Sequence, residues 1–533
     1  MSLALSTSIV ECAQHSVIRE RVAHPPYGMP LHAQHETVTG TACRGDPSVC
    51  LQRAVGRQSH TGRKAHLHVL GAADTVTPPD DASKHALVTP LPRHLRQTMP
   101  MDPTHSLREA PSLPPSWYAA SVAPRTPLPA LDGDTQADVA ILGAGYTGLS
   151  AALELASRRL RVVVLESCQV GWGASGRNGG QVLSGYGCEV DVLESLVGLD
   201  DARTLFDHSR QGVQLVRDRI ARHGIDCHWV AGHANVPITA RQARTLQHDM
   251  ERLTGHYDYP MQWWDQATLR EQLDSTRYRG AMFDPLSGHL HPLAFAQGLA
   301  DAAVAAGATV HEHTPVLELQ RHRRPALRTA TGTVHADHVL LAGNAWLEGI
   351  APELERYIMP VGTYVGATPV LGAERVRALI RNDMAVSDTS LVLDYFRLSH
   401  DHRVVFGGGA SYSSRPPAGL AQVMQRRLWQ VFPQLHGVPM EYLWGGYVDI
   451  TTRRAPHWGR LTPDIYFAQG FSGHGVAAAN LAGQVIAEAI AGQAGRLDVF
   501  ERLPQHPFPG GRLLRTPLLV ATMAFVKLRN LIW

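Results

Sequence analysis

Three glycines in the first third of the chain have the spacing of a nucleotide-binding turn. Gly143, Gly145 and Gly148 follow the apolar run 139–142, which predicts a buried parallel strand, and a helical pattern of apolar residues comes after them. In such a turn the glycines let the backbone leave the strand, approach a pyrophosphate and pack the helix closely on the strand. The free N–H groups and the dipole of the helix N-terminus then hold the phosphates. The spacing predicts that this turn binds a dinucleotide.

A carboxylate completes this β-α-β unit. The second apolar run, 162–165, ends on Glu166, eighteen residues after Gly148. At that place an acid can accept hydrogen bonds from the ribose hydroxyls of an adenosine. The alternative interpretation is a strand, turn and helix without a nucleotide, in which Glu166 is an exposed acid after a strand.

The segment that follows indicates which dinucleotide is bound. Residues 171–181 read Gly-Trp-Gly-Ala-Ser-Gly-Arg-Asn-Gly-Gly-Gln. So many glycines beside Ser, Asn and Arg predict a backbone pressed against a flat polar ligand, with N–H donors exposed to it. This composition suits an isoalloxazine and its diphosphate, whereas a nicotinamide enzyme would continue with further strands and helices. Arg177 and Asn178, inside the segment, need polar partners or a solvent-filled cavity.

Two pairs of polar side chains further along the chain are candidates for catalysis. His289 and His291 stand in Ser-Gly-His-Leu-His-Pro, and either could lie near the cofactor or be a hydrogen-bonded histidine at an interface. Tyr395 and Arg397 alternate on one face of an expected strand. They could close a substrate pocket, where Arg397 would bind a carboxylate through its guanidinium fork. A packed tyrosine with its arginine at the surface is the alternative.

With these motifs the chain, from about Trp117 to the C-terminus, resembles the FAD-dependent amino acid and amine oxidases related to glycine oxidase and D-amino acid oxidase. The resemblance rests on Gly-Ala-Ser-Gly-Arg-Asn-Gly-Gly-Gln at 173–181, Ser-Gly-His-Leu-His-Pro at 287–292, Gly-Phe-Ser-Gly-His-Gly at 470–475 and Phe-Pro-Gly-Gly-Arg at 508–512. It implies an α/β fold: an FAD-binding Rossmann-like domain of the glutathione reductase and D-amino acid oxidase type, with an inserted α+β substrate domain built on an antiparallel sheet.

The resemblance also assigns parts of the chain to parts of FAD. Val316 would meet the adenine through backbone groups, Ala342 and Gly343 would approach the diphosphate, and a helix N-terminus at 473–476 would face the pyrimidine side of the flavin. The residues expected to contact FAD are Gly143, Gly145, Tyr146, Thr147, Gly148, Glu166, Gly173, Ala174, Ser175, Gly176, Arg177, Asn178, Gly179, Gly180, Gln181, Val316, Ala342, Gly343, Gly473, His474, Gly475 and Val476. The candidate catalytic residues are Arg177, His289, His291, Tyr395 and Arg397.

The cysteines indicate how the flavin is attached. Relatives with a covalently linked flavin use a cysteine in the downstream half, whereas all six cysteines of this chain lie at or before residue 227. We therefore expect noncovalent FAD. The lack of a Cys-x-x-Cys pair predicts a reducing, cytoplasmic setting, and no spacing of ligand residues predicts a metal site.

The activity implied by the resemblance is oxidation of an amine C–N bond. A hydride would pass from the carbon bearing a neutral amine to flavin N5, the imine would be hydrolysed to an aldehyde and ammonia, and O2 would reoxidise the flavin and give H2O2. The favoured substrate is gamma-glutamylputrescine or a similar gamma-glutamyl amine. One alternative is an amino acid oxidase or dehydrogenase of the glycine, sarcosine or D-amino acid type, with a quinone or O2 as acceptor. A flavin-binding protein that serves regulation or assembly is another.

Length and composition limit the other possibilities. A chain of 533 residues accommodates roughly two to four domains, and a net charge of +2 gives no reason to expect a nucleic acid partner. No run of 18 apolar residues is present, so no spanning helix is expected. The tail 513–533 could lie on a membrane surface, but docking on the protein's own core or on a partner subunit is favoured.

The expected domain order follows from these segments. Residues 1–100 show no sustained period and predict a disordered extension or a start upstream of the true one, and 101–135 is the family's N-terminal segment. The FAD-binding domain is expected to combine 136–190, 289–355 and 453–500. The substrate domain is expected to combine 191–288 and 356–452, where an antiparallel sheet at 359–450 forms the floor of a cavity, and 501–533 is the C-terminal tail.

Overall fold

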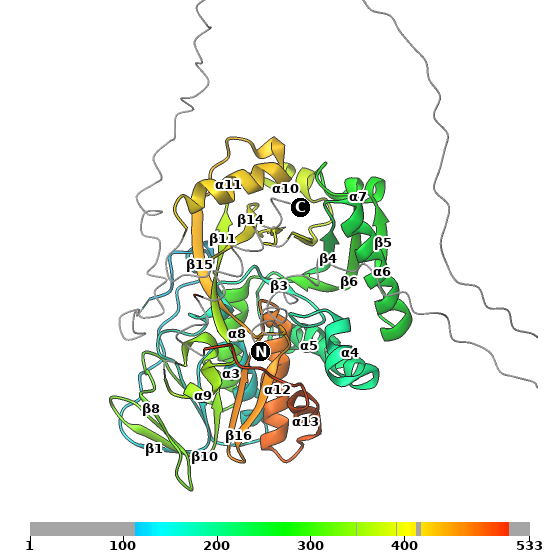
Figure 1. Ribbon diagram of the computed structural model, residues 1–533. Helices are drawn as coiled ribbons and strands as arrows, with labels where there is room; N and C mark the ends of the chain where they lie inside the picture. Colours follow the sequence, from blue (N-terminus) through cyan, green and yellow to red (C-terminus); the bar gives the residue numbers. More distant parts are fainter. Residues whose placement is uncertain (1–111, 348, 391, 412–416, 511–516, 518–533) are drawn as a thin grey trace, which may run out of the picture. The chain divides into compact units, whose positions relative to one another are not determined.

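The computed structural model describes residues 112–510 and residue 517, apart from 348, 391 and 412–416. The expected extension at 1–100 and the part of the tail beyond 510, except Pro517, lie outside the described residues. The described residues form two β-sheets with helices packed on them (Figure 1).

The first sheet, sheet A, gathers the carboxyl ends of its parallel strands at one edge. In the described residues its order is β16-β17-β10-β1-β2-β7. The parallel strands are β1 (Thr135–Leu142), β2 (Val162–Leu165), β7 (Thr309–His311), β10 (Thr333–Leu341) and β17 (Ile465–Gln469), and the antiparallel ones are β16 (His457–Thr462), β8 (Glu318–Gln320) and β9 (Ala326–Arg328). The chain leaves β1 toward β2 on one side while β10 joins on the other, so the carboxyl end of β1 is a topological switch point, where α/β sheets bind ligands.

The alternation of side chains along β1 explains how both faces of sheet A are covered. Val139 and Ile141 join one core cluster with α3 (Tyr146–Ser157), α8 (Pro292–Ala305) and α12 (Gly475–Ile490). Ala140 and Leu142 join the cluster on the opposite face, which includes residues of α9 (Pro352–Glu355). These strands are buried on both faces, as their nearly continuous apolar sequences predict.

The second sheet, sheet B, is mixed and is larger than expected. In the described residues its order is β15-β11-β14-β13-β12-β4-β6-β3, with β5 paired to β6. Its strands are β3 (Gln181–Val182), β4 (Val230–Val236), β5 (Gln262–Asp265), β6 (Gly280–His289), β11 (Met359–Ala367), β12 (Ala385–Asp388), β13 (Tyr395–Leu398), β14 (Val404–Ser411) and β15 (Tyr442–Ile450). The sequence predicts an antiparallel sheet over 359–450; the structure extends it with strands of 181–289, and β4 and β12 are parallel neighbours.

One face of sheet B carries an apolar core, and the other lies against the glycine-rich segment. Phe396 of β13 packs in the apolar core with residues of α7 (Gln266–Gln272), α10 (Ala373–Leu379) and α11 (Leu420–Val431). On the opposite face, Tyr395 packs near Trp117 and Tyr118 of α2 (Trp117–Ser121). The polar face of the sheet is therefore the one turned toward the candidate cofactor residues.

Of the remaining helices, α5 (Leu199–His223) packs on α12, α4 (Val190–Val197) packs on α5, and α6 (Ala240–Tyr257) packs on β5 and β6 of sheet B. Among the described helices no single one is long and apolar enough to cross a membrane; α12 and α13 (Gly495–Glu501) meet the criteria of length and composition only together, as a pair bent by 120°.

Some strand boundaries differ from those predicted. Local sequence pattern predicts a strand at 316–319 and another at 228–238. The structure begins the first at Glu318 and the second at Val230, because His228 has a φ of 51°, in the left-handed region. The pattern also predicts separate strand pieces at 333–336 and 338–341, which form the single strand β10, paired along its length with β1.

Candidate functional site

The turns at the carboxyl ends of β1, β2 and β10 lie side by side. Leu142 is in register with Leu165 and Leu341, so Gly143, Glu166 and Ala342 follow at one edge of sheet A. Gly143 has a φ of +102°, and a Cβ there would lie 2.7 Å from the carbonyl oxygen of Ala342. This position therefore requires glycine, both for its conformation and for the close approach of the two turns. Gly343 follows Ala342 and begins η4 (Asn344–Trp346).

The N-terminus of α3 is open toward the same edge. A Cβ on Gly148 would lie 1.9 Å from the carbonyl oxygen of Gly143, so the helix packs against its own turn without space for a side chain. Gly145 is the N-cap and offers no side-chain hydrogen bond. The N–H of Tyr146 donates to Ser175 Oγ at 3.0 Å, and the remaining N–H groups of the first turn, that of Thr147 included, have no partner inside the helix.

The carboxylate of Glu166 is held by backbone N–H groups. Ala144 N donates to one oxygen at 2.8 Å and Cys168 N donates to the other at 3.0 Å. Desolvation raises the pKa of this carboxyl, and the nearby Glu312 adds to the rise. Because a carboxylate oxygen accepts more than one hydrogen bond, both oxygens can still receive a ribose hydroxyl.

Within the glycine-rich segment 171–181, the side chain of Asn178 holds the backbone of its own turn. The Asn178 amide nitrogen donates to the carbonyls of Ala174 and Ser175, at 3.1 and 3.0 Å, and its oxygen accepts from Gly180 N at 2.8 Å. Ala174, Ser175 and Gly176 form the short helix η3 (Ala174–Gly176). The segment ends in β3, where Gln181 is paired with His289 of β6.

Arg177 joins this segment to sheet B. Its Nε donates to Trp172 O at 2.6 Å, its Nη1 donates to Gly445 O at 3.3 Å, and its guanidinium lies 4.2 Å from the centre of the Trp172 ring. Trp444 Nε1 in turn donates to Arg177 O. Burial lowers the pKa of Arg177 to about 10. The side chain thus links β15 to the glycine-rich segment through backbone carbonyls.

Arg397 is buried, which rules out the interpretation that places it at the surface. Its side chain is 3% exposed, and it donates from Nε to Gly179 O, from Nη1 to Leu398 O and from Nη2 to the hydroxyl of Tyr118. Tyr118 donates to Asn178 O at 2.8 Å. Arg397 is therefore not at the surface: its Nε holds Gly179 directly, and its Nη2 supports the Tyr118 hydroxyl that holds Asn178. Tyr395, on the same face of β13, packs against Gly179.

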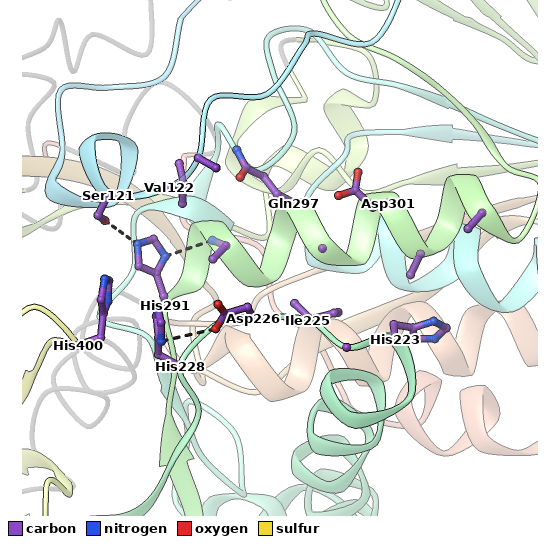
Figure 2. A pocket seen from close by; sticks show the side chains of 16 residues that line it. Ser121, Val122, His223, Ile225, Asp226, His228, His291, Gln297, Asp301 and His400 are labelled. Atoms are coloured by element: carbon purple, nitrogen blue, oxygen red, sulfur yellow. Dashed lines mark hydrogen bonds and ion pairs between the residues drawn. The ribbon is translucent and has the colours of Figure 1, made fainter.

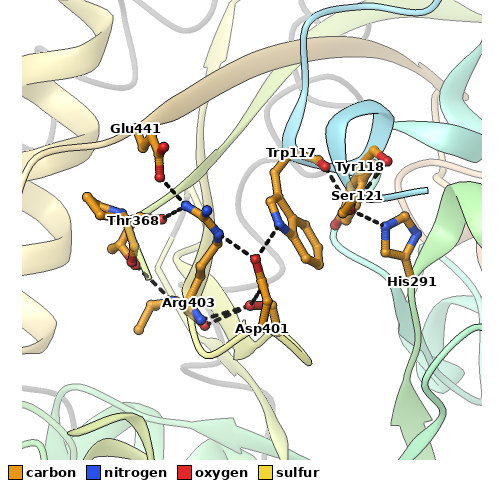
Figure 3. Close-up of polar contacts among 11 residues, drawn as sticks. Trp117, Tyr118, Ser121, His291, Thr368, Asp401, Arg403 and Glu441 are labelled. Atoms are coloured by element: carbon orange, nitrogen blue, oxygen red, sulfur yellow. Dashed lines mark hydrogen bonds and ion pairs between the residues drawn. The ribbon is translucent and has the colours of Figure 1, made fainter. Parts of the chain in front are cut away.

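His291 caps α8 and joins it to α2. Its Nδ1 accepts from Ala294 N at 3.1 Å, and its Nε2 lies 2.9 Å from Ser121 Oγ (Figure 3). Burial lowers the pKa of His291 to about 3, so the ring is neutral. On its outer side, a cavity of about 590 Å³ extends along α8 to Asp301 (Figure 2). Among the predicted site residues, only His291 lines this cavity.

His289, two residues before His291, is also buried and has different partners. Its Nε2 lies 2.7 Å from Asp383 O, just before β12, and burial lowers its pKa. Because β6 pairs with β3 at this residue, His289 is adjacent to Gln181. The structure therefore separates the two histidines: His289 belongs to sheet B beside the glycine-rich segment, and His291 to the α2–α8 contact.

The start of α12 forms the other side of the candidate site. The turn at Gly473 comes after β17, and His474 donates from Nε2 to Ser184 O at 3.0 Å. The N-cap of α12 has no side-chain hydrogen bond, so the N–H groups near Gly475 and Val476 stay available. Val316 lies between β7 and β8, outside the turn that begins α12. It packs against the core cluster that contains Leu142, at the carboxyl end of β1.

Sequence reasoning missed a buried carboxylate that shapes this turn. Asp449, near the end of β15, accepts from the backbone N–H groups of Gly470 and Phe471, and burial raises its pKa to about 7. It also missed His233 and Ser387 on sheet B, which contact each other at 3.1 Å, while Ser387 Oγ donates to Gln181 Oε1 at 2.9 Å. An acid or a histidine within an apolar strand was the only signal in the sequence.

These groups fit FAD. Two long helices begin at the same edge of sheet A with N-caps that offer no side-chain hydrogen bond, as a diphosphate and a flavin pyrimidine require. A Cβ on Gly173 or Gly473 would meet no described atom within 4 Å, so open space adjoins both turns. Glu166 supplies the acceptor for a ribose.

Comparison with known proteins agrees with this fit. The model of a family described as DAO, FAD dependent oxidoreductase, matches residues 138–489. Gamma-glutamylputrescine oxidoreductase of Escherichia coli (strain K12) is 41% identical over 416 residues, which cover 78% of this chain and 98% of that protein. Glycine oxidase of Geobacillus kaustophilus is 25% identical over 372 residues, covering 66% and 92%.

Solved structures show the same fold. The crystal structure of glycine oxidase from Geobacillus kaustophilus superposes with a TM-score of 0.58 at 23% identity, covering 67% of this chain and 95% of that one. L-Proline dehydrogenase from P. horikoshii superposes with a TM-score of 0.59 at 20% identity, covering 69% and 96%.

Proposed function

The chain belongs to the DAO family of FAD-dependent oxidoreductases, and we propose that it oxidises gamma-glutamylputrescine or a similar gamma-glutamyl amine. The observation that carries the proposal is the 41% identity to gamma-glutamylputrescine oxidoreductase over nearly the whole length of that protein. The motifs on which the resemblance rests, namely the glycine-rich segment, the His289–His291 motif and the turn before α12, lie far apart in the sequence. The resemblance is therefore not confined to the nucleotide-binding turn. The buried histidines of the His289–His291 motif, whose pKa burial lowers, are uncharged groups beside the cofactor residues, and such groups suit a neutral amine.

Bound FAD would supply the hydride acceptor for the carbon that bears the amine nitrogen. The residues that we propose to hold it are Glu166 at the ribose, the first turn of α3 with Ser175 at the diphosphate, and the first turn of α12 at the pyrimidine side. Arg177 and Arg397 keep the glycine-rich segment in place through its backbone carbonyls. Sheet B orients the substrate and keeps water away from the reacting carbon.

We also propose that the two sheets mark two domains. Sheet A takes its strands from 135–165, 309–341 and 457–469, which lie within the segments expected for the FAD-binding domain except for Thr135. Most strands of sheet B come from the segments expected for the substrate domain, 191–288 and 356–452. β3 is the exception, because the glycine-rich segment passes from one sheet to the other.

An anaerobic screen of flavin reduction tests the substrate. Gamma-glutamylputrescine should reduce the flavin faster than putrescine, glycine, sarcosine or any D-amino acid at equal concentration. Faster reduction by glycine, sarcosine or a D-amino acid would refute the gamma-glutamyl assignment and favour an amino acid oxidase or dehydrogenase, the second candidate, which the 25% identity to glycine oxidase supports.

We propose O2 as the electron acceptor. Oxygen consumption and hydrogen peroxide formation should match the amine oxidised, mole for mole. Turnover with a quinone or a dye but without oxygen uptake would assign a dehydrogenase instead, and it would leave the amine substrate unaffected.

A further inference from the structure

A row of side chains crosses the face of sheet B that lies against the glycine-rich segment. Asn235 on β4 is in register with Ser387 on β12, which is paired with Tyr395 on β13. Side chains in register on neighbouring strands project from the same face of a sheet. Tyr395 packs against Gly179, and Ser387 contacts Gln181, so this row faces the segment that we propose to hold the flavin.

Ser387 and its neighbours satisfy one another. Ser387 Oγ donates to Gln181 Oε1, so its contact with His233 Nε2, at 3.1 Å, requires that the histidine donate. The Gln181 amide nitrogen donates to Val386 O at 3.0 Å. His233 is buried and its pKa is lowered to about 4, mainly by that burial. At neutral pH this part of the wall therefore consists of uncharged groups in a fixed orientation.

The nearest carboxylate is also engaged. Asp284, paired with His233 between β6 and β4, accepts from the hydroxyl of Tyr259 at 2.7 Å and from the hydroxyl of Ser287 at 2.5 Å. The backbone N–H groups of Leu286 and Ser287 donate to its second oxygen. His289 and His474 are the other titratable groups near His233, and burial lowers the pKa of each. Asp284 is therefore engaged within its own turn, and the other carboxylate near these histidines, Asp383, lies 3.6 Å from His289 Nε2.

Asn235 differs from these neighbours. Its Oδ1 is buried and has no hydrogen-bond partner among the described residues. A buried acceptor without a donor is costly, and native proteins keep few of them, often where a ligand supplies the partner. In this row, Asn235 is the acceptor that still lacks a donor.

We infer that Asn235 Oδ1 accepts a hydrogen bond from an N–H of the amine substrate and thereby selects and orients that amine. The inference rests on the proposed function only in requiring an amine as substrate. An amine that donates to Asn235 keeps its nitrogen lone pair free, and the lone pair must be free when the adjacent carbon loses a hydride. The neutral surroundings, with Ser387 and His233 already paired, favour the uncharged amine over its ammonium form.

The test compares Asn235→Leu with Asn235→Asp, which keeps an acceptor, and with Asn382→Leu as a control in the exposed turn before β12. The holoenzymes are matched for FAD content. The dissociation constant of the best reducing amine is taken from the saturation of anaerobic flavin reduction. The methyl analogue of the same amine, in which a CH3 group replaces the amino group so that the analogue is uncharged, lacks the amine N–H and cannot be oxidised at that position, is titrated by its effect on the flavin absorption spectrum.

We expect Asn235→Leu to weaken binding of the amine about tenfold, because a hydrogen bond to a buried acceptor typically contributes that factor to binding. Binding of the methyl analogue should not weaken. Asn235→Asp should retain binding of the amine and shift the pH profile of reduction, and Asn382→Leu should behave as wild type.

Equal weakening for the amine and for its methyl analogue would show that the substitution merely distorts the pocket, and no weakening for either would place the amine elsewhere. Both results overturn the inference. If gamma-glutamyl amines do not reduce the flavin but another amine does, the proposed substrate fails, and the same comparison is made with that other amine.

Discussion

Single side chains at this site act mainly through the backbone groups they hold. The oxygens of Glu166 accept from Ala144 and Cys168, and Arg177 and Arg397 donate to backbone carbonyls. A charged side chain that binds the backbone fixes a turn at a chosen place, because its partners cannot move without loss of a buried hydrogen bond. At the residue scale, two kinds of group therefore differ: those that contact the ligand themselves, and those that hold the ligand-binding backbone in place.

Replacement of Glu166 tests the first kind of group. Glu166→Ala should raise the dissociation constant of FAD by about ten- to a hundredfold, since a charged acceptor of hydroxyl groups contributes about 1.5–3 kcal/mol. Flavin reduction in protein that is still loaded should be nearly normal. Fluorescence titration of the apoprotein with FAD measures the effect, and Glu374→Ala, on the exposed side of α10, is the matched control. An unchanged affinity would remove Glu166 from the ribose site.

Replacement of Arg397 tests the second kind. Arg397→Met leaves Gly179 O and Leu398 O without a donor, so we expect a loss of roughly 1.5–3 kcal/mol in the free energy of unfolding and weaker FAD binding. Urea unfolding and FAD titration measure both. If instead stability is unchanged and only the KM of carboxylate-bearing amines rises, Arg397 binds the substrate carboxylate, as its sequence position first suggested.

At the scale of elements, the turn between β1 and α3 depends on the absence of side chains. The helix lies so close to its own turn that a Cβ at Gly148 would come within 1.9 Å of Gly143 O. That contact is with backbone, so relief requires α3 to move away from sheet A. Since α3 also packs on α8 and α12, its displacement would disturb both helix N-termini proposed to hold FAD.

Gly148→Ala should therefore destabilise the protein by at least roughly 1–3 kcal/mol and abolish FAD binding. Gly255→Ala, within α6 and with open space around the new methyl group, should stabilise it by about 0.5–1 kcal/mol. Thermal unfolding and the ratio of flavin to protein absorbance give both results. A Gly148→Ala protein with full FAD content would show that the turn is not packed as described.

At the scale of the whole molecule, several histidines are buried in the neutral form. Burial lowers the pKa of His291 to about 3 and those of His233 and His457 to about 4, from an ordinary value of 6.5. They lie on α8, on sheet B and on sheet A, so the effect is spread over the fold. Each must gain a proton when the chain unfolds in mild acid.

These histidines should therefore destabilise the protein as the pH is lowered below 6.5, whereas the carboxyls of Asp449 and Glu189, whose pKa burial raises to about 7, act in the opposite direction. In the window between 6.5 and about 4, the unfolded chain binds protons at these histidines that the native chain does not, which costs about 1.4 kcal/mol per pH unit for each histidine. The stabilisation is fully present above pH 6.5. Urea unfolding at pH 7, 6 and 5 measures the slope, and His291→Asn, which keeps an N-cap acceptor, should reduce it. The same slope in the wild type and in His291→Asn would contradict the burial of a neutral ring at this position.

Local pattern in the sequence was sufficient for the nucleotide-binding turn. The strand, glycines, helix, strand and acid from Val139 to Glu166 form one continuous stretch of sequence, and the structure has β1, α3 and β2 in these places. The same holds for the helix after Gly475. Such features depend on short-range sterics and apolar periodicity, which the chain expresses within one or two turns.

Partners distant in sequence were decided only by the tertiary structure. Arg397 meets Gly179 across 218 residues, and Ser387 meets Gln181 across 206. Sequence allowed Arg397 a surface position or a pocket mouth, and it gave no reason to single out Asn235, His233 or Asp449. Which strands become neighbours in sheet B determines which polar groups share a face, and that order arises from packing of the whole chain. By itself, then, the sequence determined the cofactor class and its turn, whereas the residues around the substrate required the fold.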